Sequence, residues 1–144
     1  MTDPEPYDIE RARSYWRHAP SGEGKHDTSD LSASSDEHLL TAWGSAFRSR
    51  FGGYPDEDLF LRTFARFAKG KRLLSIGSGL GFHELYYQAH GAEVTCADIV
   101  RSNLHVIERV SGLRRLGVRA FDLATSASTT FSSNESFGAP AASC

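Results

Sequence analysis

Residues 73–100, LLSIGSGLGFHELYYQAHGAEVTCADIV, contain the pattern that decides the fold. The short apolar run RLLSI predicts a buried strand at residues 72–76, and a glycine-rich turn follows it. The apolar spacing after the turn predicts a helix over residues 82–90. AEVTCA, residues 92–97, predicts a second strand that ends at Asp98. Strand, helix and strand in this order favour an α/β fold with a parallel sheet and helices on its faces.

The turn and the acid after the second strand indicate the kind of ligand. Gly77, Ser78, Gly79 and Gly81 form the turn, and glycines let the backbone bend sharply and let a ligand approach without a Cβ clash. The free N–H groups at the start of the following helix favour polar or anionic groups. Asp98 can accept both hydroxyl hydrogens of a ribose. The sequence therefore predicts a site for a nucleoside-bearing cofactor.

The spacing of the glycines separates two kinds of cofactor. The dinucleotide fingerprint G-x-G-x-x-G would need a third glycine at position 82, where this chain has Phe82. The observed pattern is G-x-G-x-G, after a short apolar strand and before a GAEV turn and a strand ending in Asp98. This arrangement resembles the first two cofactor-binding motifs of the class I, seven-stranded, Rossmann-like S-adenosylmethionine-dependent methyltransferases. Nicotinamide dinucleotide is the weaker reading of the same turn.

The resemblance implies a role for seven residues. The loop under the methionine and ribose part of S-adenosylmethionine would consist of Gly77, Ser78, Gly79 and Gly81. Asp98 would bind the ribose hydroxyls, Ile99 would pack on the adenine face, and Asp122 would accept the adenine amino group. Ser75 stands where the family most often has an acid. No catalytic residue and no metal ligand is assigned.

The sequence after Asp98 predicts one more helix and one more strand. Ser102 or Asn103 is expected to cap the helix, and VRAF predicts a strand that closes at Asp122. Residues 123–144 contain nine Ser or Thr and one charged side chain, so we expect a disordered, low-complexity tail. Because the family has about seven strands, we expect a partial doubly wound sheet in the order 3-2-1, truncated or frameshifted after the third strand. The first strand would then be an edge open to association.

The sequence before the glycine turn predicts N-terminal helices. The first 38 residues hold nine acidic and four basic side chains, with a short helix at IERARSYW and a loop over residues 19–35. A helix is expected from His38, and a second one from an Asp56 N-cap, with a buried stripe of Phe60, Phe64 and Phe67. These helices resemble the N-terminal caps of bacterial small-molecule methyltransferases, which implies a small-molecule methyl acceptor. The expected divisions are an acidic segment at 1–37, a cofactor-binding half-domain at 38–122 and the tail at 123–144.

Composition limits the remaining possibilities. The 144 residues are 40% hydrophobic and 24% charged, which is typical of one soluble globular domain. A net charge of −2 argues against nucleic acid as a partner. The acidic N-terminus lacks the features of a signal peptide, and no apolar run is long enough to span a bilayer, so we expect a cytoplasmic protein without a membrane partner. Cys96 and Cys144 have no metal-ligand spacing.

Three interpretations stay open at this point. The first is a truncated or frameshifted S-adenosylmethionine-dependent methyltransferase that keeps the cofactor loop and lacks the acceptor site. The second is a non-catalytic module that binds S-adenosylmethionine or pairs with a chain supplying further strands. The third is half of a Rossmann domain that binds NAD or another nucleotide.

Overall fold

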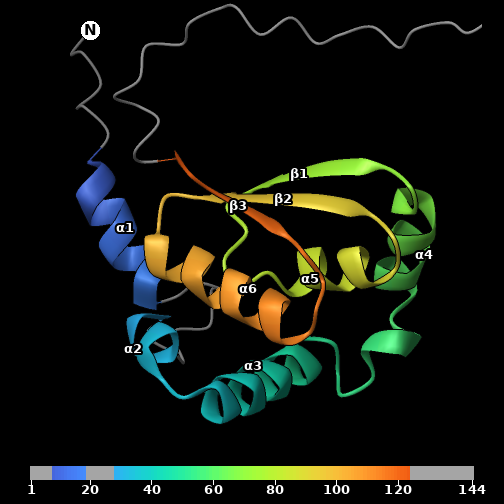
Figure 1. The fold of residues 1–144 in the computed structure, drawn as a ribbon, viewed down its shortest axis with the longest axis horizontal. Helices are drawn as coiled ribbons and strands as arrows, with labels where there is room; N and C mark the ends of the chain where they lie inside the picture. The colour runs from blue at the N-terminus through green and yellow to red at the C-terminus, as the bar shows by residue number, and fades with distance from the viewer. Residues whose placement is uncertain (1–7, 19–27, 124–144) are drawn as a thin grey trace, which may run out of the picture.

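The computed structural model describes residues 8–18 and 28–123. Within these residues there are six α-helices, a short 3₁₀ helix and three strands, and helices and strands alternate from β1 onward (Figure 1). In chain order they are α1 (Ile9–His18), α2 (Thr28–Ala33), α3 (Asp36–Arg50), η1 (Pro55–Glu57), α4 (Leu59–Ala68), β1 (Arg72–Ile76), α5 (Phe82–Ala89), β2 (Glu93–Asp98), α6 (Arg101–Leu113) and β3 (Arg119–Asp122). The expected tail lies almost entirely outside the described residues.

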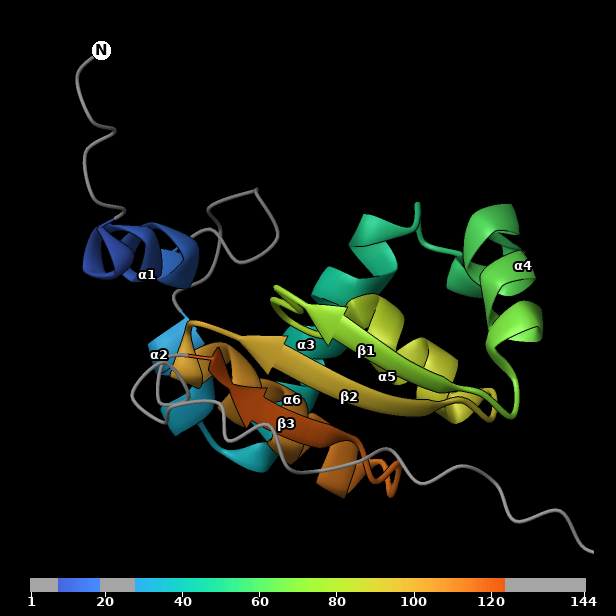
Figure 2. The same ribbon diagram turned by 90° about the horizontal axis from the view of Figure 1, so that it is seen from above.

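The three strands form one parallel sheet in the order β1-β2-β3. Ile76 lies beside Ala97, and Asp98 lies beside Asp122, so the carboxyl ends of the strands meet at one edge. Figure 2 shows β2 between the two outer strands. The α/β class, the parallel sheet and the N-terminal helices that the sequence predicts are therefore confirmed.

Helices cover only one face of this sheet among the described residues. α5 and α6 pack on β2, and α3 packs on α6 from below (Figure 1). On that side Val94 and Cys96 are buried against Leu85 and Ile107. The opposite face carries Leu74, Ile76 and Phe121, which are 67%, 71% and 49% exposed. We call these two sides the covered face and the open face.

Trp43 joins α3 to the turn that precedes α5. Its indole Nε1 donates to the Leu80 carbonyl oxygen at 2.8 Å, and its ring stacks on Phe47 with centroids 5.1 Å apart. Phe82 meets the Trp43 ring edge-on at 5.4 Å. A buried indole N–H needs an acceptor, and Leu80 supplies it in the middle of the glycine turn. The turn is thereby anchored to the helical layer.

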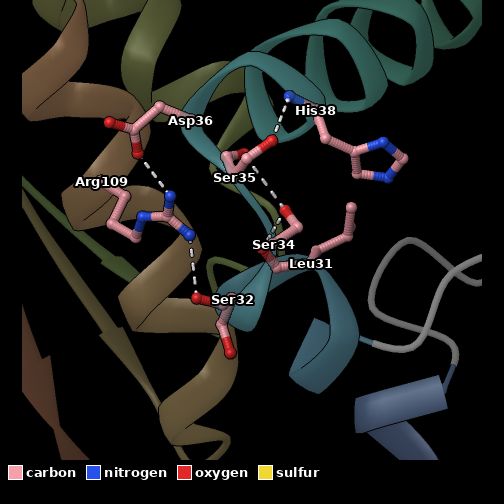
Figure 3. A network of polar contacts seen from close by, with 7 residues as sticks. All are labelled: Leu31, Ser32, Ser34, Ser35, Asp36, His38 and Arg109. Atoms are coloured by element: carbon pink, nitrogen blue, oxygen red, sulfur yellow. Dashed lines mark hydrogen bonds and ion pairs between the residues drawn. The ribbon is translucent and has the colours of Figure 1, made fainter.

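A polar network ties α6 to the junction of α2 and α3 (Figure 3). Arg109 donates to the Ser32 carbonyl oxygen at 2.9 Å and pairs with the carboxylate of Asp36. Ser35 caps α3 by accepting from the His38 amide at 3.3 Å. The network holds α2 and α3 against α6, the helix that leads to β3.

The strand expected to be buried at residues 72–76 forms as β1, but none of its residues is buried, because helices cover only one face of it. Four further local expectations are wrong. Residues 28–33, expected as loop, form α2, and its Leu31 is buried. The N-cap of α4 is Asp58 rather than Asp56, because Pro55 starts the 3₁₀ turn η1 and Asp58 accepts from the Leu61 amide at 2.7 Å. α6 begins at Arg101, so neither Ser102 nor Asn103 is its cap.

The last wrong expectation is the buried stripe of α4. Phe60 and Phe67 are 66% and 63% exposed, while the buried residues are Leu61, Ala65 and Ala68. Phe64 is half-buried against Tyr87, with ring centroids 4.8 Å apart. Small alanines let α4 lie close to α5, so the alanine side, not the phenylalanine side, faces the core.

Candidate ligand site at the glycine turn

The turn between β1 and α5 has the backbone geometry that only glycine adopts readily. Gly77, Gly79 and Gly81 have φ angles of 74°, 54° and 69°. A Cβ on Gly81 would lie 2.7 Å from Cγ1 of Ile107, so this glycine is required for packing against α6. A Cβ on Gly77 would meet nothing within 4 Å. The first glycine therefore borders open space, and the last one belongs to the core.

Hydrogen bonds hold the turn against the end of β2. The Gly77 amide donates to the Ala97 carbonyl at 2.8 Å, and the Ser78 hydroxyl donates to the Ser75 carbonyl at 3.2 Å. The Gly79 amide donates to Oδ2 of Asp98 at 2.9 Å. The structure thus brings the predicted acid and the predicted loop into direct contact.

The Asp98 carboxylate is only 4% exposed and already has donors. Besides Gly79, it accepts from the Val100 amide at 2.8 Å and from Nδ2 of Asn103 at 3.4 Å. The Oδ1 atom of Asn103, itself 1% exposed, has no hydrogen-bond partner. Oδ2 of Asp98 already accepts from the Gly79 amide and from Asn103, so a ligand hydroxyl would compete with these donors there.

Ile99 and Asp122 lie together in a cavity next to the Asp98 contact. Both line a cavity of about 360 Å³ between the end of the sheet, α1 and α6, whose lining does not include the glycine turn or Asp98. Arg13 of α1 donates from Nε to the Ile99 carbonyl at 3.2 Å and so fastens α1 over this end of β2. Arginines supply much of the polar lining, namely Arg13, Arg17 and Arg101. The seven predicted residues are therefore divided between a buried loop contact and a neighbouring open cavity.

A carboxylate also stands beside Ser75, where the sequence lacks one. The Ser75 hydroxyl donates to Oε1 of Glu84 at 2.5 Å. Glu84 lies in the first turn of α5, and sequence reasoning missed it and Asn103 because both contacts depend on tertiary packing. The only available signal for Glu84 was an acid in the helical turn directly after the glycines.

Two buried titratable groups near the loop are held in their neutral forms. Burial raises the pKa of the Cys96 thiol to about 12, and the nearby Glu84 carboxylate adds to the effect. Burial likewise raises the pKa of Tyr87 to about 12, again with a contribution from Glu84. Neither group can act as a thiolate or phenolate near neutral pH.

No group of three His, Cys, Asp or Glu side chains in the described part of the chain is arranged to hold a metal ion. None of the helices within residues 8–18 and 28–123 is long and apolar enough to cross a membrane. Comparison of the chain with protein-family models, curated proteins and solved structures finds no match.

Proposed function

We propose that the chain binds S-adenosylmethionine at the carboxyl ends of β1 and β2, as the cofactor-binding part of a methyltransferase. The main support is the 2.9 Å hydrogen bond between the Gly79 amide and Asp98, which joins a left-handed glycine turn to an acid on the next parallel strand. In open α/β sheets ligands bind outside the carboxyl ends of the strands. The proposed methyl acceptor is a small molecule.

A nucleoside would need the buried Asp98 contact to open, because the cavity with Ile99 and Asp122 does not include Asp98. Asp98 would exchange the Gly79 amide for the ribose hydroxyls, and the open space beside Gly77 would take the rest of the ligand. Ile99 would pack on the adenine ring, and Asp122 would accept its amino hydrogen, both from the cavity of about 360 Å³. When bound, S-adenosylmethionine supplies a methyl group on a positively charged sulfur. The chain's own part is to bind and orient the nucleoside.

The experiment is calorimetric titration with S-adenosylhomocysteine and, separately, with NAD. The full chain is expected to bind the former and not the latter, and Asp98→Ala should remove detectable binding, because each charge-assisted hydrogen bond contributes about 1.5–3 kcal/mol. Glu108→Gln, an exposed acid on α6, is the matched control and should bind normally. Near-ultraviolet circular dichroism checks that Asp98→Ala remains folded. Unchanged affinity in Asp98→Ala contradicts the ribose assignment.

One observation favours a second candidate, a phosphorylated nucleotide. The cavity that contains Ile99 and Asp122 is also lined by Arg13, Arg17 and Arg101, and S-adenosylmethionine has no phosphate that would pair with arginines. For this candidate, NAD or ADP should bind more tightly than S-adenosylhomocysteine, and Arg101→Gln should weaken that binding. The same titrations therefore choose between the two candidates.

A further inference from the structure

The proposed function does not use the edge of β1 that faces away from β2, which we call the free edge. Among the described residues β1 pairs only with β2. The Lys71 carbonyl accepts from Glu93, and the Gly77 amide donates to Ala97, both at 2.8 Å. Because backbone groups alternate in direction along a strand, residues 71, 73, 75 and 77 face β2. The N–H and C=O groups of Arg72, Leu74 and Ile76 therefore face outward.

A groove runs along this edge. Figure 2 shows α4 beyond β1, on the side away from β2. Between them is a cavity of about 180 Å³. Its lining consists of Phe64 of α4, Leu73, Leu74 and Ser75 of β1, Glu84 and Tyr87 of α5, and Val94 of β2. The cavity therefore adjoins the strand whose outward backbone groups pair with no other described strand, and Phe64 and Tyr87 give it an aromatic side.

The groove carries a single acidic group. Glu84 lies in it, half-buried, and accepts from the Ser75 hydroxyl at 2.5 Å. The surrounding side chains, Phe64, Leu73, Tyr87 and Val94, are apolar or aromatic. At pH 7 the burial-raised pKa of Tyr87, about 12, keeps its phenol neutral. A cation would therefore complement the groove next to Ser75, and an apolar side chain would complement it next to Leu73.

We propose that this groove binds an extended segment of a partner protein, which adds a strand to β1. The segment carries an apolar residue opposite Leu73 and, two positions away, a lysine or arginine opposite Ser75 that pairs with Glu84. Alternate residues of a strand point to the same face, so both side chains enter the groove together. Backbone hydrogen bonds to Arg72, Leu74 and Ile76 supply affinity, and the two inward side chains supply specificity.

The elements around the groove favour an extended segment as its occupant. Phe64 of α4 and Leu73 of β1 line the same cavity, and Figure 2 shows α4 beyond β1 on the side away from β2. An extended chain laid along an exposed strand edge is the way in which other proteins bind peptides by strand addition. This inference goes beyond the ligand site at the glycine turn and does not depend on it.

The first test uses the peptide Thr-Val-Thr-Lys-Thr, blocked at both ends and labelled for fluorescence anisotropy. Its valine and lysine are two positions apart. The full chain is expected to bind it, and the same peptide with norleucine in place of lysine should bind about five-fold more weakly, as for a partly exposed ion pair. Glu84→Gln, which can still accept from Ser75, should reduce binding of the lysine peptide to the norleucine level and leave the norleucine peptide unaffected. Equal binding of both peptides by the wild-type chain overturns the charge assignment.

The second test measures the backbone contacts without any substitution. In amide hydrogen exchange, Leu74 and Ile76 should exchange quickly in the free chain and become protected when the peptide is added. Leu73 and Ser75, bonded to β2, should be protected in both states. Protection that fails to appear at Leu74 and Ile76 overturns strand addition.

A variant pair completes the design. Leu74→Pro removes one outward N–H without removing a bond to β2, and it should weaken peptide binding about ten-fold. Phe121→Ser on the opposite edge strand is the control and should bind as the wild type does. Binding of S-adenosylhomocysteine is measured in the same samples, so failure of the groove and failure of the ligand site are observed separately.

Discussion

The covered face and the open face of the sheet consist of alternate residues of the same three strands, yet they have opposite environments. On the covered face Val94 and Cys96 are buried under α5 and α6. On the open face Leu74 and Ile76 are about as exposed as residues of a loop, at 67% and 71%. Both crossover helices, α5 and α6, lie on one side of the sheet (Figure 1), so only that side is covered among the described residues. Parallel strands are normally buried on both faces, so their sequences are apolar throughout.

The largest expected effect is from a charge placed on each face in turn. Val94→Asp should destabilise the chain by about 5 kcal/mol or prevent folding, because an unpaired carboxylate would be buried under α5. Ile76→Asp, on a neighbouring strand of the open face, should change the free energy of unfolding by less than about 0.5 kcal/mol. Urea titration followed by circular dichroism measures both. Similar losses for the two variants would show that the open face is buried in solution.

The next largest expected effect is a slower alkylation of the Cys96 thiol, which lies on the covered face. A rise in the Cys96 pKa from 9.0 to about 12 lowers its thiolate fraction at pH 8 about 1,000-fold, so alkylation should be slower by at least that factor than in the unfolded chain. The Cys144→Ser variant leaves Cys96 as the one thiol, and mass spectrometry after iodoacetamide treatment measures the rate.

The sign of the pH dependence follows from the raised pKa. In the unfolded chain the Cys96 thiol ionises above pH 9, while in the folded chain it stays protonated until about pH 12. Its contribution to stability is therefore complete below pH 9 and declines as the pH rises towards 12. Alkylation of the native chain at the unfolded rate would contradict the burial of Cys96.

The strands and the site edge were predictable because they rest on local rules. RLLSI is β1 residue for residue, and the rule that carboxyl ends of parallel strands meet at one edge places Asp98 beside the turn. The sequence did not predict that the Asp98 carboxylate accepts hydrogen bonds from Gly79, Val100 and Asn103. These bonds depend on how closely the turn packs against the end of β2.

Helix α4 shows why periodicity alone was insufficient. Phe60, Phe64 and Phe67 keep helical spacing, and so do Leu61, Ala65 and Ala68, one residue further along. Hydrophobicity favours the phenylalanines, whereas close packing on α5 favours the alanines. Phe60 and Phe67 remain exposed, and the Lys71 ammonium lies 3.3 Å from the centroid of the Phe67 ring.

Glycine substitutions compare the two ends of the turn. Gly81→Ala should cost about 2–3 kcal/mol, since its φ of 69° is strained for alanine and its Cβ would lie 2.7 Å from Ile107. Gly77→Ala should cost about 1 kcal/mol, from its φ of 74° alone, because nothing lies within 4 Å. Thermal unfolding measures the stability of both variants. An equal loss of stability would show that Gly77 also packs in the core.

The smallest expected effect belongs to the open face. Leu74→Thr and Ile76→Thr each place a β-branched threonine on β1, a residue type that strands favour. They remove apolar surface that is already in contact with water. Each should change the free energy of unfolding by less than about 0.5 kcal/mol. If copies of the chain associate through this face, both substitutions should instead lower stability, and the loss should grow with protein concentration because association stabilises by mass action. Urea midpoints at several concentrations, with light scattering on the same samples, therefore distinguish a face exposed to water from one covered by another molecule.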